Sequence, residues 1–375
     1  MANQQELTKF IPLASPDIND DDIAEVVRVL KSGMLVQGKE VDQFERAVAE
    51  YIGVEEAICV SNGTATLHLA LQCLGVGRGD EVIVPAFSYV ATANVVELTG
   101  ATPVFVDIDI TTFNIDADAI EAKITNRTKA IMPVHEFGLA ANMTAIRQIA
   151  QKYQIAVVED AACALGAREN GRYVGAFGDF GSFSLHPRKA ISSGEGGVLT
   201  TNNPELAAKV RVLRNHGIQL VNGQMDFVEA GYNYRMTDFQ AALVHSQFRR
   251  LPGILEYKQA LAEVYFNEIN NPLITLPKIP ENRNHTWQTF HVLLDDSLSQ
   301  ADIIKQLREQ GIGVNYGAQC IPAQTYYKSK YSLPCTELYP NALKAFTHGL
   351  ALPIYEKLKK EDIQYIASIV NQISN

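Results

Sequence analysis

The chain has 375 residues, of which 47% are hydrophobic and 20% are charged, and its formal net charge at pH 7 is −10. These values are typical of an ordinary globular protein with a substantial core, and the length predicts about two domains. Nucleic acid and anionic membrane surfaces do not attract an acidic chain, so we expect neither as a partner. The sequence starts without the basic-then-apolar order of a secretory signal. Each apolar stretch is interrupted well before about 18 residues, which predicts no membrane span and a cytoplasmic protein.

The cysteines and histidines form no recognisable metal or redox motif. The number of cysteines is odd, no two of them have the close spacing of a zinc or disulfide-exchange site, and the eight histidines include no H-E-x-x-H pattern. We therefore expect reduced thiols and no bound metal.

Two helices are predicted at the start of the chain. In residues 19–33 acidic residues gather in the first turn, apolar residues follow at helical spacing, and Gly33 ends the segment. Residues 38–53 have a second helical pattern. Further on, helical stretches such as residues 64–75 and 142–154 alternate with short apolar runs. The runs cover residues 56–60, 81–87, 102–108, 129–135, 155–160, 180–185 and 196–201. Several of them are solid in Val, Ile and Phe, as in strands buried on both faces.

The alternation predicts a doubly wound α/β domain with a large, mostly parallel sheet. The pattern changes near residue 250, where long helical material begins. We expect a large domain over residues 12–250 and a smaller C-terminal α/β domain over residues 251–375. In the second domain the sequence predicts a half-buried strand in 285–296, a helix in 299–311, a strand-like run in 312–317, a Pro/Tyr-rich loop through residue 340 and a last helix with repeated Ile.

Ligands of open α/β sheets bind at the carboxyl ends of the strands, so the residues after each predicted strand are candidates for a site. After the first strand, Ser61, Asn62 and Gly63 lead into a helix at Thr64. Exposed backbone N–H groups at such a helix start can hold an anion. Taken alone, the stretch fits a plain helix N-cap better.

Three further strand ends carry candidate side chains. Tyr89 could cover a flat ring, although an isolated tyrosine is more often part of a core or rim. Asp160 ends a strongly apolar strand, where a carboxylate is costly unless a cation or hydrogen-bond donors meet it; helix capping explains it about equally well. The last end holds Ser184 and Lys189 beside a Gly-Glu-Gly-Gly turn. A lone lysine beside glycines is usually a solvated loop residue.

Together the four ends describe one site with an anion cradle, a stacking ring, a buried carboxylate and a lysine. Pyridoxal 5'-phosphate (PLP) needs these four parts, because it has a phosphate, a flat pyridine, a ring nitrogen that works best protonated and an aldehyde that condenses with an amine. In this interpretation Asp160 favours the protonated ring nitrogen. Lys189 binds the aldehyde and then moves protons as a general acid and base.

Several segments resemble the nucleotide-sugar aminotransferases of the DegT/DnrJ type, which are PLP enzymes with the aspartate-aminotransferase fold (fold type I). The resemblance runs from about Pro12 to near the C terminus, and the serine-to-lysine stretch is its most specific part. It rests on "VSNGTATLHLAL", "DEVIVPAFSYVATANVV", "PVFVDID", "VVEDAACALGA", "FSLHPRKAISSGEGG" and "GYNYRMTDFQAAL".

The resemblance implies roles for individual residues. Lys189 corresponds to the Schiff-base lysine, Asp160 to the partner of the ring nitrogen, and Tyr89 to an aromatic ring on the cofactor. Cys163 stands where other members often have Gln or His near the ring hydroxyl of the cofactor; this departure leaves open whether Cys163 only packs. The implied phosphate ligands are the backbone of Gly63 and Thr64, the Ser184 hydroxyl and, from the partner of a homodimer with shared active sites, Asn233 or Arg235.

The resemblance also implies the reaction. L-Glutamate donates its amino group, and a nucleotide-linked keto sugar, most often a 4-keto-6-deoxyhexose and less often a 3-keto sugar, receives it. Candidate substrate contacts are His186, Arg188 and the loop with Tyr316, for which ordinary loop duty is at least as good an explanation.

The sequence is also compared with the patterns of three other functions by the residues each would require. Some family members dehydrate deoxysugars with PLP and have histidine in place of the lysine, but here Lys189 stands in the lysine position. A non-catalytic regulatory protein of the same fold is the second possibility, and the complete set of cofactor residues argues against it. A nicotinamide dehydrogenase is disfavoured because no G-x-G-x-x-G follows the first strand.

Overall fold

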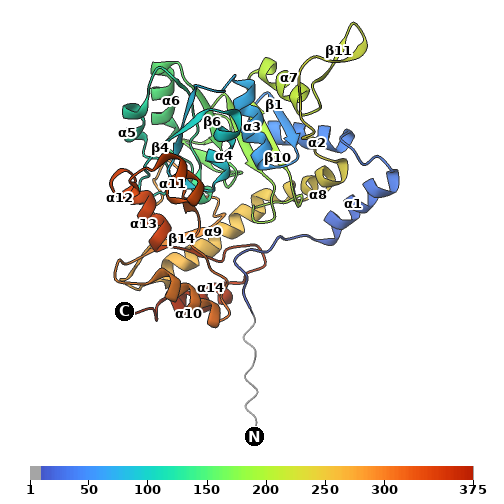
Figure 1. Cartoon of the computed structure of the whole chain (residues 1–375). Coiled ribbons are helices and arrows are strands. Elements are labelled where there is room, and N and C mark those ends of the chain that lie inside the picture. The colour runs from blue at the N-terminus through green and yellow to red at the C-terminus, as the bar shows by residue number, and fades with distance from the viewer. Residues whose placement is uncertain (1–9, 375) are drawn as a thin grey trace.

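The computed structural model describes residues 10–374, which form a large α/β domain with a smaller layer of helices and strands packed beside it (Figure 1). The large domain is built on a seven-stranded sheet. Its strands, in spatial order, are β1 (Glu56–Val60), β10 (Gly197–Thr201), β9 (Phe180–Ser184), β6 (Ala156–Asp160), β5 (Thr128–Ile131), β2 (Glu81–Pro85) and β4 (Thr102–Val106).

Six of the seven strands run in the same direction, and β10 alone is reversed, because it pairs antiparallel with both β1 and β9. The expectation of a mostly parallel sheet is confirmed. The carboxyl ends of β1, β9, β6, β5 and β2 therefore open on one edge of the sheet. In the register of β6 and β9, Asp160 lies opposite Ser182.

Helices cover both faces of this sheet and bury its apolar side chains. One face packs on α3 (Gly63–Cys73), α4 (Ala91–Thr99) and α7 (Pro204–Leu213). The other face packs on α2 (Lys39–Ile52), α8 (Asp238–Phe248), α5 (Ala117–Ile120) and α6 (Met143–Tyr153). Side chains of successive strand residues point to opposite faces, as expected for a sheet with two cores.

The C-terminal part has its own core, which includes Trp287, Phe290 and Ile363. It contains α9 (Leu251–Glu268), α10 (Gln300–Glu309), α14 (Lys360–Val370) and the three-stranded sheet of β13 (Ile274–Thr275), β14 (Phe290–Leu294) and β16 (Gly349–Leu352). The first turns of α9 pack on the large domain and its later turns on the C-terminal core. We keep the division at residues 250 and 251 as a proposal, and it falls at the start of this shared helix.

Three details of the sequence interpretation are wrong. The strand in 285–296 is shorter and buried at every position, because β14 is the central strand of its sheet. Residues 312–317 form no strand; Ile312 and Asn315 make only isolated bridges, to Ile11 and Ala351. The supposed Pro/Tyr-rich loop holds β15 (Gln319–Cys320), α11 (Thr325–Tyr331), α12 (Cys335–Leu338) and the start of α13 (Pro340–His348). Its tyrosines pack on the large domain's core and stabilise helices that their residue types alone do not favour.

The remaining elements are short, apart from the first helix. The chain begins with α1 (Asp20–Ser32), whose N-terminus is capped by Asn19 and whose C-terminus ends at Gly33 with a φ of 74°. The others are β3 (Phe87–Ser88), β7 (Arg168–Glu169), β8 (Arg172–Tyr173), the hairpin of β11 (Ile218–Val221) and β12 (Gln224–Phe227), and the 3-10 turns Glu121–Lys123, Glu136–Gly138 and Ile321–Ala323. Within residues 10–374, no helix combines the length and apolar character that crossing a bilayer requires.

A buried ion pair attaches α2 and α7 to β1, the strand that leads into the predicted anion cradle. The guanidinium of Arg214 donates to Glu45 Oε1 at 2.5 Å and to the carbonyl of Cys59 at 2.6 Å. The same carboxylate oxygen accepts from the Cys59 N–H at 2.8 Å. Both charged side chains are at least nine-tenths buried, so neither can recover its hydration if the other is removed.

We predict that Arg214→Met lowers the free energy of unfolding by about 3 kcal/mol, because it leaves the Glu45 carboxylate buried and unpaired. Arg211→Met is the matched control, since Arg211 pairs with Glu56 at 2.7 Å while both side chains stay about one-third exposed. That substitution should cost less than about 1 kcal/mol. Urea denaturation of both variants measures the difference, and equal losses would contradict this account of the buried pair.

Candidate active site

A cavity of about 510 Å³ opens at the carboxyl ends of the parallel strands. Its walls come from the segments that follow β1, β2, β5, β6 and β9, and from residues 288–289 and 317–318 of the C-terminal part. Nine of the predicted site residues line it: Gly63, Thr64, Tyr89, Asp160, Cys163, Ser184, His186, Arg188 and Lys189.

Asp160 ends β6 at the floor of the cavity and is only 4% exposed. Its Oδ2 accepts from the Thr92 hydroxyl at 2.8 Å, and its Oδ1 accepts from the Ala162 N–H at 3.2 Å. Burial raises the pKa of this carboxyl, whereas the two hydrogen bonds and the nearby Lys189 lower it. A cation placed in the cavity above Asp160 would oppose the effect of burial and lower this pKa.

The predicted cradle lies at the N-terminus of α3. Asn62 caps this helix by accepting from the Ala65 N–H at 2.8 Å, so the plain N-cap interpretation is correct for Asn62. The N–H groups of Gly63 and Thr64 belong to the first turn and have no intrahelical acceptor. A Cβ at position 63 would lie 2.8 Å from the Ser184 Cβ, so only glycine lets the helix start approach the end of β9. An anion there would meet backbone N–H groups and the Ser184 hydroxyl together.

Lys189 reaches the same cavity from the loop after β9. Its Nζ donates to Cys163 Sγ at 3.0 Å, and its backbone N–H donates to the His186 carbonyl at 2.8 Å. Burial raises the pKa of the Cys163 thiol, and the charge of Lys189 opposes that shift. Lys189 and Asp160 thus face one cavity from different strands, and Lys189 is among the charges that act on the pKa of Asp160.

The cavity rim is more exposed than its floor. Tyr89 is 66% exposed, and His186 and Arg188 are also exposed. Partial burial lowers the pKa of His186. The Arg188 carbonyl accepts from the Gln288 side-chain amide at 3.1 Å, which connects the rim to the C-terminal part.

Three predicted residues lie outside this cavity in the single chain. Asn233 is exposed and forms an isolated bridge with Asn215, whose side chain also accepts from Arg235. The ring of Tyr316 packs edge-on against Phe346 at 5.4 Å, whereas the next residue, Gly317, does line the cavity.

The sequence analysis missed Glu136, Ser88 and Thr92. Thr92 holds Asp160, and the Ser88 hydroxyl lies 3.1 Å from that of Thr92. Glu136 follows β5, is 4% exposed and is one of the residues that line the cavity; its buried carboxyl oxygen Oε2 has no hydrogen-bond partner. The rule about strand ends pointed to this position as well, because "KAIMPVH" is followed directly by Glu136.

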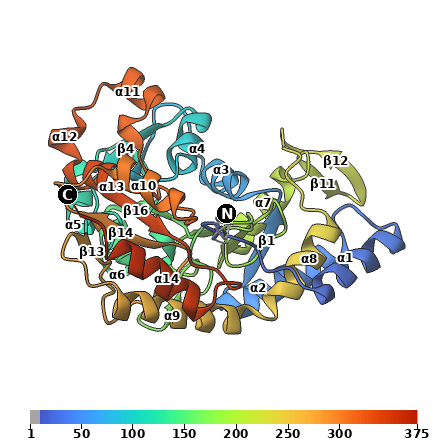
Figure 2. The same ribbon diagram turned by 90° about the horizontal axis from the view of Figure 1, so that it is seen from below.

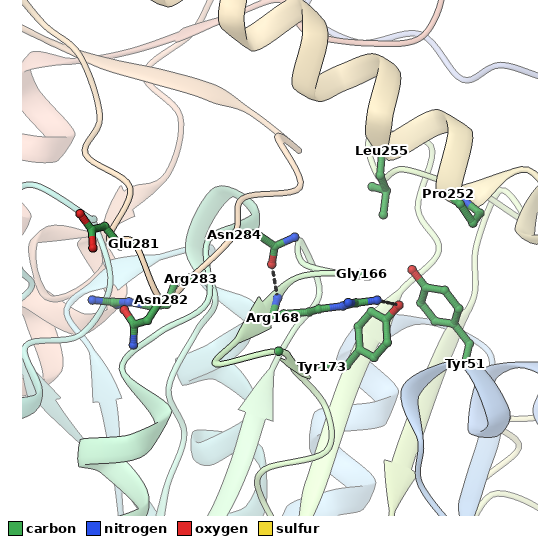
Figure 3. A pocket seen from close by; sticks show the side chains of 11 residues that line it. Tyr51, Gly166, Arg168, Tyr173, Pro252, Leu255, Glu281, Asn282, Arg283 and Asn284 are labelled. Atoms are coloured by element: carbon green, nitrogen blue, oxygen red, sulfur yellow. Dashed lines mark hydrogen bonds between the residues drawn. The ribbon is translucent and has the colours of Figure 1, made fainter.

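A second cavity, of about 650 Å³, lies between the β7–β8 hairpin, the start of α9 and residues 281–284 (Figure 3). Its cationic groups already have partners within the protein. The Arg168 guanidinium lies over the Tyr173 ring, 4.0 Å from its centroid, and donates to the Tyr173 hydroxyl. Arg283 donates to the Ala140 carbonyl at 3.2 Å. The Arg283 contact holds residues 281–284 against the large domain, and among residues 10–374 no lysine or histidine lines this cavity.

The first cavity has the donor set that PLP requires. It combines a buried carboxylate that lines the cavity, a helix N-terminus whose first residue is glycine, a hydroxyl at the end of β9 and a lysine amine that reaches the same cavity. Among residues 10–374, no group of three or more metal-ligating side chains is placed to hold an ion.

Comparisons with known proteins agree with this geometry. Residues 16–371 match the DegT/DnrJ/EryC1/StrS aminotransferase family. The chain is 35% identical to the spore coat polysaccharide biosynthesis protein SpsC of Bacillus subtilis over 385 residues, 98% of each chain. Among solved structures, Spr1654 of Streptococcus pneumoniae in its PLP form is 32% identical, with a TM-score of 0.92 over 96% of this chain and 98% of that one.

A third relative is DesV of S. venezuelae, which is 31% identical with a TM-score of 0.88 over 96% of this chain and 98% of that one. The fold is that of PLP-dependent enzymes of fold type I, as expected. The chain belongs to the DegT/DnrJ/EryC1/StrS aminotransferase family and is a PLP-dependent sugar aminotransferase.

Proposed function

We propose that the protein transfers the amino group of L-glutamate to a nucleotide-linked keto sugar, most often a 4-keto-6-deoxyhexose, in the synthesis of amino sugars for a surface polysaccharide or glycoconjugate. The observation that carries the proposal is the meeting of Lys189, Asp160 and the α3 cradle in one cavity of a sugar aminotransferase fold. The similarity to SpsC supports the polysaccharide context.

The chain's own residues would divide the work as follows. Bound PLP supplies an aldehyde that accepts the amino group and a ring that withdraws electrons. Asp160 would hold the ring nitrogen protonated, and Gly63, Thr64 and Ser184 would hold the phosphate. Lys189 Nζ would bind the aldehyde carbon and, once substrate displaces it, carry a proton between the two carbons involved in the transfer.

Substrate contacts are assigned to the exposed rim. Tyr89 would cover the cofactor ring, and the Arg188 guanidinium and the His186 imidazole would meet the anionic part of the sugar nucleotide, which needs only local donors. Tyr316 is left as a candidate because its loop continues into Gly317 at the cavity wall.

Two of the other functions, a dehydratase and a regulatory protein, fit the site less well. A dehydratase of this family would have histidine in place of Lys189. A regulatory protein would not need a lysine amine that reaches the cavity, nor a carboxylate buried at its floor.

We also propose a homodimer that shares its active sites. The helix α1 was predicted from its apolar spacing, yet Ile23, Val27 and Leu30 are all exposed in the single chain. The β11–β12 hairpin projects from the same side of the molecule as α1 (Figures 1 and 2).

One face of that hairpin is apolar and uncovered. The pairs Ile218↔Phe227 and Leu220↔Met225 lie on it, and Leu220, Met225 and Phe227 are about two-thirds exposed or more. A second copy of the chain would cover these side chains, and Asn233 or Arg235 would then be available to the partner's phosphate. We expect this dimer in the cytoplasm, where the five cysteines would stay reduced.

The central test is turnover. We predict that the purified protein takes up PLP and is yellow, that L-glutamate bleaches it and yields 2-oxoglutarate, and that a panel of UDP-, dTDP- and GDP-linked keto sugars contains an acceptor that restores the colour. Lys189→Ala is the control variant. It should still bind PLP without a covalent bond, while kcat falls by about 10²- to 10⁴-fold or more. A protein that cannot be loaded with PLP, or near-normal turnover of the variant, would contradict the proposal.

Asp160→Asn should lower kcat between about 10- and 150-fold, because it removes a charge-assisted hydrogen bond to the ring nitrogen. Steady-state kinetics and circular dichroism of the variant measure activity and folding separately. An unchanged rate would mean that the carboxylate only organises the backbone at Ala162 and the Thr92 hydroxyl.

The dimer is tested at the hairpin. We predict that the wild-type protein has twice the chain mass in light scattering and that Met225→Asp/Phe227→Asp shifts it toward the monomer, because both side chains would be buried between copies. Gln219→Asp, an exposed substitution on the other face of the hairpin, should leave the mass unchanged. A monomeric wild-type protein would refute the shared sites.

A further inference from the structure

Glu136 is a buried carboxyl in the active-site cavity to which the proposed function gives no task. It begins the 3-10 turn after β5 and lines the cavity, and its buried Oε2 has no hydrogen-bond partner. The turn is held firmly: the Glu136 N–H donates to Asn114 Oδ1 at 2.9 Å, and Phe137 adopts a φ of 55°. A buried polar atom without a partner is costly, so this carboxyl stands beside the cavity with its hydrogen-bonding capacity incompletely used.

The surroundings of Glu136 favour its neutral form. Burial, followed by the nearby Asp160, raises the pKa of Glu136 to about 8, although Lys189 and the Ser88 hydroxyl act in the opposite direction. Cys163 is a further titratable neighbour, because the charge of Glu136 raises the pKa of its thiol. At pH 7 most of the carboxyl is therefore protonated and can donate one hydrogen bond.

The sheet order places Glu136 relative to the parts of the site. The cradle comes from the ends of β1 and β9, Asp160 from β6 and Glu136 from β5, and these strands follow one another in the order β1-β10-β9-β6-β5. Glu136 therefore lies on the opposite side of Asp160 from the cradle. In PLP the ring hydroxyl and the phosphate arm flank the aldehyde carbon, so with the arm in the cradle the hydroxyl points toward the β5 side.

We propose that Glu136 is a positioning residue whose carboxyl O–H donates a hydrogen bond to the ring hydroxyl oxygen of bound PLP. The residue at position 163 offers only a weak donor, because it is a cysteine and its sulfur accepts from Lys189. Glu136 supplies the missing donor from the neighbouring strand. This inference rests on the proposed roles of Asp160, Lys189 and the cradle.

The test compares wild type, Glu136→Gln and Glu136→Leu. Two quantities are measured without substrate: the dissociation constant of PLP from equilibrium dialysis, and the pH midpoint of the absorbance change of bound PLP. The Gln variant keeps a donor of similar shape, so both values should stay close to wild type. The Leu variant should bind PLP about tenfold more weakly, and its midpoint should rise by about one unit, because a ring oxygen without a donor holds its shared proton more tightly.

Glu169→Leu is the matched control, because Glu169 is also buried with an unpaired carboxyl oxygen but lies outside the cavity. Its PLP affinity and absorbance midpoint should be those of wild type. An unchanged Glu136→Leu variant would overturn the inference. A Gln variant as impaired as the Leu variant would also overturn it, since charge and not a donated hydrogen bond would then matter.

Infrared spectroscopy decides the matter if the Leu variant does not fold. Wild-type holoenzyme at pH 7 should show the carbonyl band of a neutral carboxylic acid that PLP binding shifts and that Glu136→Gln lacks. The band of an ionised carboxylate in its place would overturn the inference. If the wild-type protein takes up no PLP at all, the proposed function fails, and that result is distinct from each of these outcomes.

Discussion

The register of β6 in the sheet determines which carboxylate faces the active-site cavity, because two adjacent acidic residues end this strand and point to opposite faces. Glu159 is fully buried and accepts hydrogen bonds from the backbone of Gly175, Phe177 and Gly178 at 2.7 to 2.8 Å. It also lies 3.0 Å from His135 Nε2. These contacts tie the turn before β9 and the end of β5 to β6. A shift of one residue would exchange the two acids and put the structural anchor in the cavity.

The rest of the site follows from this register. With Glu159 fixed, Asp160 faces the cavity, and β9 delivers Ser184 to the start of α3. The loop after β9 then places Lys189 in the same cavity as Asp160. Since all these groups project from ends of one rigid sheet, their spacing does not depend on mobile loops, apart from the segment that carries the lysine.

Much of the large domain could be predicted from the sequence, because strands buried on both faces are solid apolar runs and their ends mark the site. This rule found Asp160 and Ser184. It did not distinguish Glu136 from the other residues that follow strands, because no local sequence pattern indicates that this carboxyl is buried with an unpaired oxygen. That property depends on β5 lying beside β6 in the sheet. In the C-terminal part the local pattern failed where packing decides: the Tyr-rich segment is helical because its rings fill the core of the large domain.

Asp160, Glu136 and Lys189 also bear on how charge is balanced in the cavity. Two carboxyls that face one cation in a buried site cannot both remain charged at low cost, so ionisation of one disfavours ionisation of the other. Asp160 has two hydrogen-bond donors and Glu136 has an unpaired oxygen, so the negative charge belongs on Asp160. The proton then belongs on Glu136, and the same pair of acids can meet a positive ring nitrogen on one side and an electron-rich oxygen on the other.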